Sequence, residues 1–342
     1  MTTTRTPIVE IVGLRSASRY YCSMQKLLAF LQLCRFAAVF TAMADIFLGY
    51  LLTHQDGFES ERDFGLLLGS SACLYLAGMV FNDVFDRDDD ALERPKRPLP
   101  SGRVSVREAV SLGTCLVATG LALAGVVGIQ SAIAASLLTG CIFLYDGVLK
   151  STPIGPLVMG GCRFLNVMLG ASTASFITGE SAAWSMPQLA VAFGLGIYIT
   201  GVTWFSRHEA GESPRWQLGG ALMTVNLGLV ILIGFVVHWP EVMLSREAVE
   251  GGLQWATNMA QRSWNTALAL GFIGIIINRR LLAAVIDPSP AKVQASIRTM
   301  LLSIIILDAS LVFFVQEDRM YAIAVALLLL PATLLSKALA IT

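Results

Sequence analysis

Long apolar stretches alternate with short polar segments along the chain from residue 27 to its end. A helix rises about 1.5 Å per residue, so roughly 20 apolar residues cross the hydrocarbon core of a bilayer. Ten stretches have a suitable length, at 27–53, 64–84, 106–127, 130–148, 154–177, 187–207, 216–238, 264–286, 294–315 and 320–341. The pattern predicts an all-α, polytopic transmembrane helical bundle, with a cytoplasmic N-terminal segment at 1–24 and a single transmembrane domain at 25–342.

Composition supports the membrane assignment and excludes some functions. The 342 residues are 55% hydrophobic and 14% charged, and the mean hydropathy is +0.67. A soluble domain of this size carries far more charge. The formal net charge is zero, so we expect no nucleic-acid partner. The six cysteines mostly fall in apolar spans without paired metal spacing, which indicates small buried residues and not zinc ligands.

The distribution of Lys and Arg predicts the orientation in the membrane. With the N-terminus in the cytoplasm, eighteen of the 24 basic residues lie on the cytoplasmic side and only four on the other. This asymmetry follows the positive-inside rule. We therefore expect a multi-pass protein of a bacterial inner membrane or an equivalent membrane, with its charged motif facing the cytoplasm.

A dense charged block at 81–103 directly follows the second apolar stretch. Asn82, Asp86 and Asp90 are spaced four apart, so a continuing helix keeps them on one face, which Asp89 shares. These oxygen ligands are too few to complete the coordination of a metal ion. They suit Mg²⁺, which commonly takes its remaining ligands from water and substrate phosphates. The cations that a diphosphate needs follow at Arg94, Lys96, Arg97 and Arg103. The alternative interpretation is a solvated charged face at a helix end.

The order of residues in this block resembles a known motif. N-D-x-x-D-x-x-x-D followed by R-P-x-R-P-L-P-S-G is similar to the first aspartate-rich motif of the UbiA superfamily, the intramembrane prenyltransferases. The resemblance implies a UbiA-like bundle of nine or ten spans, since members typically have nine. It also implies Mg²⁺ as cofactor, with Asn82, Asp86 and Asp90 as metal ligands and the two aspartates essential for catalysis.

The same resemblance implies further diphosphate-binding residues. Arg35 lies about two turns into the first predicted helix, where the family carries an arginine near the diphosphate. Arg94 and Arg97 add substrate-binding cations. Tyr145 and Lys150, in Y-D-G-V-L-K, look like the family's tyrosine-then-lysine element, in which the lysine faces the departing pyrophosphate. The adjacent carboxylate of Asp146 is a candidate addition to the metal network.

Charged residues inside an apolar span are costly and are functional candidates by default. Arg163 and Asn166 lie on one face of the fifth predicted helix, because they are three residues apart. Two interpretations remain open. The pair lines a polar substrate cavity, or it forms an internal hydrogen-bonded contact that holds helices together.

The sequence departs from the family at the end of the sixth span. Members usually carry a second aspartate pair four residues apart before a glycine. Taking Gly211 as that glycine places Thr203 and Arg207 at the two aspartate positions. Arg207 can supply positive charge in place of a second metal, or Glu209, Glu212 and Asp146 can take over ligation. The third possibility is that the second metal and efficient ionisation are lost.

These observations predict Mg²⁺-dependent transfer of a prenyl group from a polyprenyl diphosphate to an aromatic or other small acceptor within the membrane lipids. The altered second motif looks more like divergent UbiA-like proteins of specialised metabolite clusters, including the ebo type. Two alternatives remain open. One is phosphoribosyl transfer onto a polyprenyl phosphate, and the other is non-catalytic binding or transport of an isoprenoid.

Overall fold

The computed structural model describes residues 24–54, 57–173, 184–208, 213–247 and 252–339, and every regular element in these ranges is helical. Residues 24–33 form a helix before the first labelled element. The others are η1 (Phe36–Ala38), α2 (Val39–Thr53), α3 (Glu61–Phe85), α4 (Arg87–Glu93), α5 (Val106–Val127), α6 (Ile129–Leu144), η2 (Tyr145–Leu149), α7 (Gly155–Gly170), α9 (Met186–Phe205), α10 (Arg215–Glu247), α11 (Gly252–Ile286), α12 (Pro290–Val315), α13 (Arg319–Leu327) and α14 (Leu329–Ala338).

Within the described ranges, nine helical segments are long and apolar enough to cross a membrane. They match nine of the ten predicted spans. The remaining one, predicted at 154–177, corresponds to α7, whose described part has only 16 residues. Residues 174–177 lie outside the described ranges. The last span consists of α13 and α14, which meet at Leu328. The protein is an integral membrane protein with the predicted helical fold.

The outer surface of the bundle is apolar where lipid surrounds it. Met223 and Val230 of α10 and Leu268, Phe272 and Ile275 of α11 are each more than half exposed. Exposed apolar surface of this extent is unstable in water but matches the acyl chains of a bilayer. The outward faces of these helices are therefore explained by the membrane.

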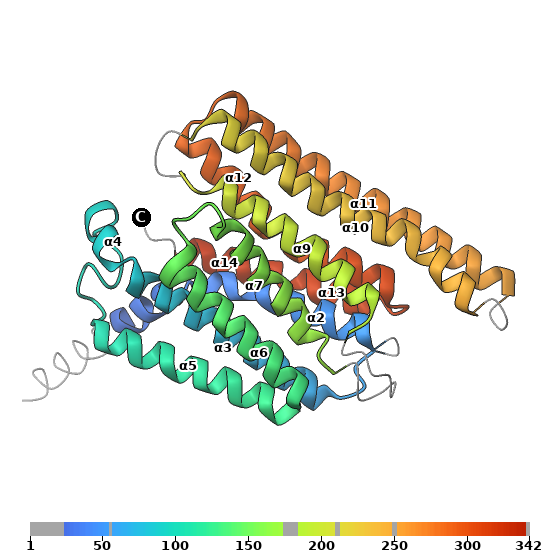
Figure 1. Ribbon diagram of the computed structural model, residues 1–342, viewed down its shortest axis with the longest axis horizontal. Helices are drawn as coiled ribbons and strands as arrows, with labels where there is room; N and C mark the ends of the chain where they lie inside the picture. Colours follow the sequence, from blue (N-terminus) through green and yellow to red (C-terminus); the bar gives the residue numbers. More distant parts are fainter. Residues whose placement is uncertain (1–23, 55–56, 174–183, 209–212, 248–251, 340–342) are drawn as a thin grey trace, which may run out of the picture.

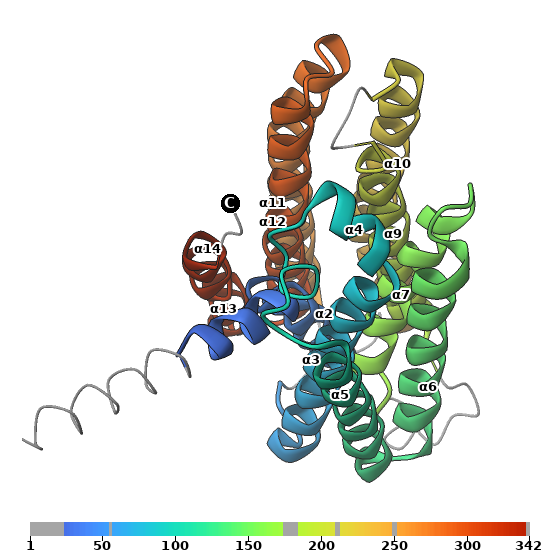
Figure 2. The ribbon, with the colours of Figure 1, turned by 90° about the vertical axis from the view of Figure 1, so that its left-hand side faces the viewer.

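Consecutive helices pack side by side and close into a ring. The contacts run from α2 through α3, α5, α6, α7, α9, α10 and α11 to α12, which packs back against α2. Figures 1 and 2 show α13 and α14 beside this ring, while α4 lies beyond one end of the bundle. At the opposite end, α10 and α11 reach further than the other helices (Figure 1).

Helices α2 and α7 also contact each other across the ring, and their backbones approach closely. A Cβ on Gly170 would lie 2.8 Å from the backbone oxygen of Ile46, so only glycine permits this approach. Small residues at such contacts are typical of membrane helices. The close approach brings Asp45 of α2 next to Arg163 and Asn166 of α7.

Candidate active site

The charged block begins where α3 ends. The backbone N–H of Asp86 donates to the oxygen of Asn82 at 3.0 Å, and that of Asp90 donates to the oxygen of Asp86 at 2.8 Å. The helical hydrogen-bond spacing thus continues from α3 into α4, as the sequence pattern predicted. Asp89, however, is exposed to solvent, whereas Asp83 of the same motif is buried. The side chains of the motif divide into two groups.

The first group joins the end of α3 to η2. The Asn82 amide donates to Asp146 at 2.9 Å, and the Lys150 ammonium donates to Asp86. η2 is a π-helical turn in which the N–H of Lys150 reaches the oxygen of Tyr145 at 2.9 Å. Such wide turns occur frequently at functional sites. Here the turn presents an acid and a base to the α3 motif within five residues.

The second group joins α3 to the segment after α4. Arg97 donates to Asp90 at 2.5 Å and to Asp83 at 3.3 Å. Both carboxylates are buried, and Arg97 is only 13% exposed. The three predicted metal ligands therefore have different partners in this structure: Asp90 pairs with Arg97, whereas Asn82 pairs with Asp146 and Asp86 with Lys150. Asp83 was absent from the predicted site residues, although it stands inside the motif.

Arg35 links the two groups. Its Nη2 donates to Asn82 at 3.2 Å and to Asp83 at 3.1 Å. The prediction that Arg35 lies two turns into a helix is wrong, because the helix is interrupted at this residue. Arg35 has left-handed backbone angles, φ 45° and ψ 46°, between the helix at 24–33 and η1. The break turns the side chain towards the end of α3. We call these eight residues the motif cluster: Arg35, Asn82, Asp83, Asp86, Asp90, Arg97, Asp146 and Lys150.

The segment between α4 and α5 folds back over the end of the bundle. Leu99 and Val104 are buried in an apolar cluster with Val80 of α3. Gly102 has φ +72°, a value that favours glycine, so the P-S-G sequence forms the turn. Within this segment Arg94 is half-buried, and Lys96 is exposed. Anchoring of the turn in the core fixes Arg97 over the acids of α3.

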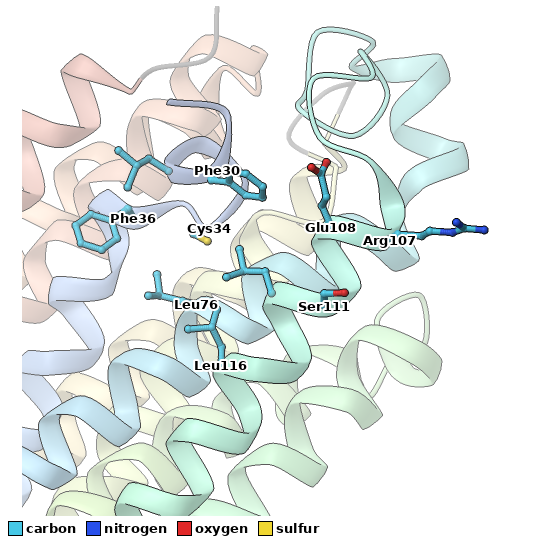
Figure 3. Close-up of a pocket in the computed structure, with 10 residues that line it drawn as sticks. Phe30, Cys34, Phe36, Leu76, Arg107, Glu108, Ser111 and Leu116 are labelled. Carbon is cyan, nitrogen blue, oxygen red and sulfur yellow. The ribbon is translucent and has the colours of Figure 1, made fainter. Parts of the chain in front are cut away.

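A pocket of about 600 Å³ opens beside the motif cluster, between the helix at 24–33, α3 and α5. Figure 3 shows Phe30, Cys34 and Phe36 on one side and Leu76 and Leu116 below, with Arg107 pointing away. Burial, and next the charge of Asp83, raise the pKa of the Cys34 thiol to about 11, so the thiol stays neutral. The pocket contains none of the motif acids. Most of the side chains that line it are apolar.

The motif cluster has the chemistry of an incomplete magnesium site. Among the described residues, no three His, Cys, Asp or Glu side chains lie close enough to hold a metal ion alone. The available donors are carboxylate and amide oxygens, which Mg²⁺ prefers, and Mg²⁺ commonly takes its remaining ligands from water and substrate phosphates. Asn82, Asp86 and Asp146 therefore fit a magnesium ion that arrives with a diphosphate.

A model of the UbiA prenyltransferase family matches residues 39–213, which include the motif cluster apart from Arg35. The chain belongs to this family. Family membership confirms the resemblance inferred from the motif and the predicted enzyme class, a prenyltransferase.

Individual family members support the assignment. The digeranylgeranylglyceryl phosphate synthase of Methanopyrus kandleri is 27% identical over 276 residues, covering 72% of this chain and 98% of that protein. The structure of a UbiA homolog from Archaeoglobus fulgidus bound to DMAPP and Mg²⁺ has a TM-score of 0.59 at 20% identity, covering 87% and 98% of the two chains. A UbiA homolog from Aeropyrum pernix K1 gives 0.57 at 20% identity, covering 80% and 96%. These likenesses establish the fold.

The altered second motif of this family member lies beside η2. Arg207 follows the end of α9, and its Nη2 donates to the backbone oxygens of Ser151, at 3.0 Å, and Thr152. Arg207 therefore holds the connection between η2 and α7 that begins at Lys150. Thr203 lies one turn earlier, within α9. Glu209 and Glu212, the proposed replacement ligands, lie outside the described residues.

Arg163 and Asn166 belong to a different place. Arg163 forms an ion pair with Asp45 at 2.8 Å, and Asn166 donates to the other oxygen of Asp45 at 2.8 Å. Asp308 of α12 lies 3.9 Å from Arg163. We call Asp45, Arg163, Asn166 and Asp308 the buried cluster. Its contacts match the second interpretation from the sequence, an internal polar contact between helices.

Proposed function

We propose that this protein transfers a prenyl group from a polyprenyl diphosphate to an acceptor within the membrane, with Mg²⁺ as cofactor. The observation that carries the proposal is the pairing of Asp86 with Lys150 and of Asn82 with Asp146 across the gap between α3 and η2. This arrangement sets metal-binding oxygens beside a cation that can receive a leaving pyrophosphate. The relative from Methanopyrus kandleri, named as a synthase of a prenylated glyceryl phosphate, supports the reaction class.

The cations of the site are placed to exchange partners. The side chains of Arg35 and Lys150 are 40% and 35% exposed, whereas that of Arg97 is 13% exposed. Arg35 and Lys150 can therefore turn from their carboxylates to phosphate oxygens when a diphosphate arrives. Arg97 stays between Asp83 and Asp90 and keeps the segment after α4 in place. Asp90 would become a metal ligand only after it releases Arg97.

Ionisation follows from these placements. Asn82, Asp86 and Asp146 would hold Mg²⁺, which would neutralise part of the diphosphate charge. Lys150 and Arg35 stabilise the negative charge that grows on the leaving oxygen as the allylic C–O bond breaks. Fixed cations aimed at developing charge usually provide the largest share of catalysis. The acceptor then captures C1 of the prenyl cation and releases a proton, while the apolar tail extends towards lipid or into the pocket beside Cys34.

Arg207 acts as a positioning residue in this scheme. Two of its contacts hold the backbone after Lys150, and a guanidinium has five N–H donors in all. The remaining donors lie on the side chain that replaces an expected metal ligand. They are available to a diphosphate oxygen. The positive-inside pattern supports a site that faces the cytoplasm.

A second candidate is a non-catalytic isoprenoid binder on the same scaffold. The observation in its favour is that Thr203 and Arg207 stand where a second acidic motif belongs. A binder would retain the diphosphate through Arg35 and Lys150 without breaking its C–O bond. The two candidates differ in turnover and not in binding.

The test incubates purified protein in detergent with MgCl₂, prenyl diphosphates of several chain lengths, and aromatic and glyceryl phosphate acceptors. Pyrophosphate release and product mass are measured. Asp86→Ala should abolish Mg²⁺-dependent release, and Asp88→Ala is the matched control, since Asp88 is exposed on the same segment. Diphosphate binding without any product, lost in Asp86→Ala, would establish the binder. Binding that is unchanged in Asp86→Ala would refute the metal assignment.

A further inference from the structure

The buried cluster lies inside the bundle and joins three of its helices, α2, α7 and α12. Asp45 of α2 and Asp308 of α12 are 0% exposed, and Arg163 of α7 is 8% exposed. Nη2 of Arg163 also donates to the backbone oxygen of Thr41 at 2.8 Å. Asn166 joins the Asp45 carboxylate and also accepts from Ser71 at 2.6 Å. This cluster does not depend on the proposed transferase activity.

The hydrogen bonds divide unequally between the two acids. Asp45 accepts a hydrogen bond from Asn166 on one oxygen, and its other oxygen lies 2.8 Å from Arg163 in an ion pair that lacks hydrogen-bond geometry. Neither oxygen of Asp308 receives a hydrogen bond from any residue that the structure describes, and Arg163 is 3.9 Å away. The two acids instead meet at one guanidinium, since the same Nη2 of Arg163 lies 2.8 Å from Asp45 and 3.9 Å from Asp308. Two ionised carboxylates that share one guanidinium repel each other, because both are negatively charged.

The charges of the cluster do not cancel. Two ionised carboxylates and one guanidinium leave a net charge of −1 in a region without solvent. Burying an uncompensated charge is strongly unfavourable, and the penalty is greatest inside a membrane. A single added positive charge removes both the net charge and the repulsion. We propose that Asp45 and Asp308 bind one proton between them, which makes the buried cluster an intramembrane proton site.

A metal ion does not fit this position. The Arg163 guanidinium already lies 2.8 Å from Asp45 and 3.9 Å from Asp308, and it would repel a second cation bound between them. In the part of the chain that the structure describes, no group of three His, Cys, Asp or Glu residues could hold a metal ion. A proton instead provides the donor that Asp308 lacks. Acid pairs that share one proton titrate as a unit.

Among the residues that the structure describes, no ion pair joins a cation other than Arg163 to Asp45 or Asp308. Helix α3 contributes Tyr75 and α9 contributes Tyr198, both near Arg163. The Tyr198 hydroxyl is already engaged with the backbone oxygen of Met300 at 3.0 Å. Arg163 is therefore the counter-charge of the pair, and the proton supplies the rest. Through this proton α12 is joined to α2 and α7, at the contact that closes the ring of helices.

Infrared spectroscopy tests the assignment, because the C=O stretch of a protonated carboxylic acid is separate from carboxylate bands. The protein is purified in an ester-free detergent at about pH 8, where an ordinary aspartate is ionised. Difference spectra are recorded between the native protein and Asp308→Asn, and between the native protein and Asp45→Asn. Each variant leaves one acid opposite Arg163, so each should lose the equivalent of one protonated carboxyl group. Asp287→Asn, at an exposed ion pair, should lose only carboxylate signal.

Further arms separate a proton from other occupants. Arg163→Met leaves two acids without a cation and should double the protonated signal. If that variant does not fold, the two Asn variants decide the question. Loss of carboxylate bands instead of the acid band in both Asn variants would overturn the proposal. Carboxylate bands of the pair that shift between K⁺ and Na⁺ buffers, with no acid band in either buffer, would assign the site to a metal cation and overturn it as well.

Discussion

The motif cluster and the buried cluster carry the same formal charge but differ in access to solvent. The motif cluster contains four aspartates and three cations, and the buried cluster contains two aspartates and one cation. Each therefore sums to −1. In the motif cluster the Arg35 side chain is 40% exposed, whereas both acids of the buried cluster are inaccessible. The accessible cluster can recruit a divalent cation and its diphosphate, while the inaccessible one is limited to a proton.

Removing the cation of the buried cluster should have the largest effect. Arg163→Met leaves Asp45 and Asp308 without a counter-charge, and breaking a buried pair costs about 3–5 kcal/mol. We expect a large drop in the thermal unfolding temperature of the detergent-purified protein. Arg107→Met is the control, since Arg107 is exposed and points away from the pocket (Figure 3). Equal unfolding temperatures for the two variants would mean that Arg163 is not the counter-charge.

Removing a cation from the motif cluster should reduce turnover and not stability. Lys150→Met eliminates the partner of Asp86 and the proposed contact with the leaving oxygen. Loss of one group that stabilises developing charge typically lowers kcat by about 10²–10³-fold. Pyrophosphate release measures kcat, and Lys150→Arg should recover part of it. If Lys150→Met lowered the thermal unfolding temperature as much as Arg163→Met does, the two clusters would not differ in this way.

The replaced second motif should show an intermediate effect. Arg207→Met releases the backbone of Ser151 and Thr152, which displaces Lys150 without removing it. Misplacing a catalytic group by about 1 Å can cost up to about 10²-fold in rate, so we expect a smaller loss than for Lys150→Met. Arg207→Asp restores an acid at the family's usual position. If the kcat of Arg207→Asp exceeds that of Arg207→Met, a carboxylate at this position can still act as a metal ligand. A kcat above that of the native protein would contradict the positioning role of Arg207.

The smallest effect concerns His54, which lies just past the membrane segment of α2. Burial lowers the pKa of His54, and Glu59 at 3.2 Å only partly opposes this. The folded protein therefore favours neutral His54, and its stability contribution is present above the unfolded pKa of 6.5 and lost as the pH falls below it. Thermal unfolding measured from pH 8 to pH 5 should show this loss, and His54→Gln should reduce it.

Local patterns in the sequence predicted the helices and the motif because both depend on neighbouring residues. Apolar length defined the spans, and the spacing of Asn82, Asp86 and Asp90 matched the family motif. The roles of the individual motif residues remain predictions. The split of that motif into two groups was not predictable, because Arg97 and Asp146 approach α3 from segments far apart in the sequence.

The buried cluster shows what local reasoning missed. Arg163 and Asn166 stood out because they are polar residues in an apolar span. Asp45 and Asp308 gave the same signal, since any acid in a membrane segment is costly. Their partnership was hidden because it joins the first and ninth predicted spans. Only the closure of the ring between α12 and α2 brings them together.

That closure also orders events during synthesis. Because a chain enters the membrane from its N-terminus, Asp45 and Arg163 are both present, as a neutral pair, once α7 has been inserted. Asp308 arrives only with α12, after three further long helices have been added. A ribosome-bound intermediate that ends after α11 therefore already has its internal charges matched, and it can wait in the bilayer. The proton enters with the last helix that completes the ring.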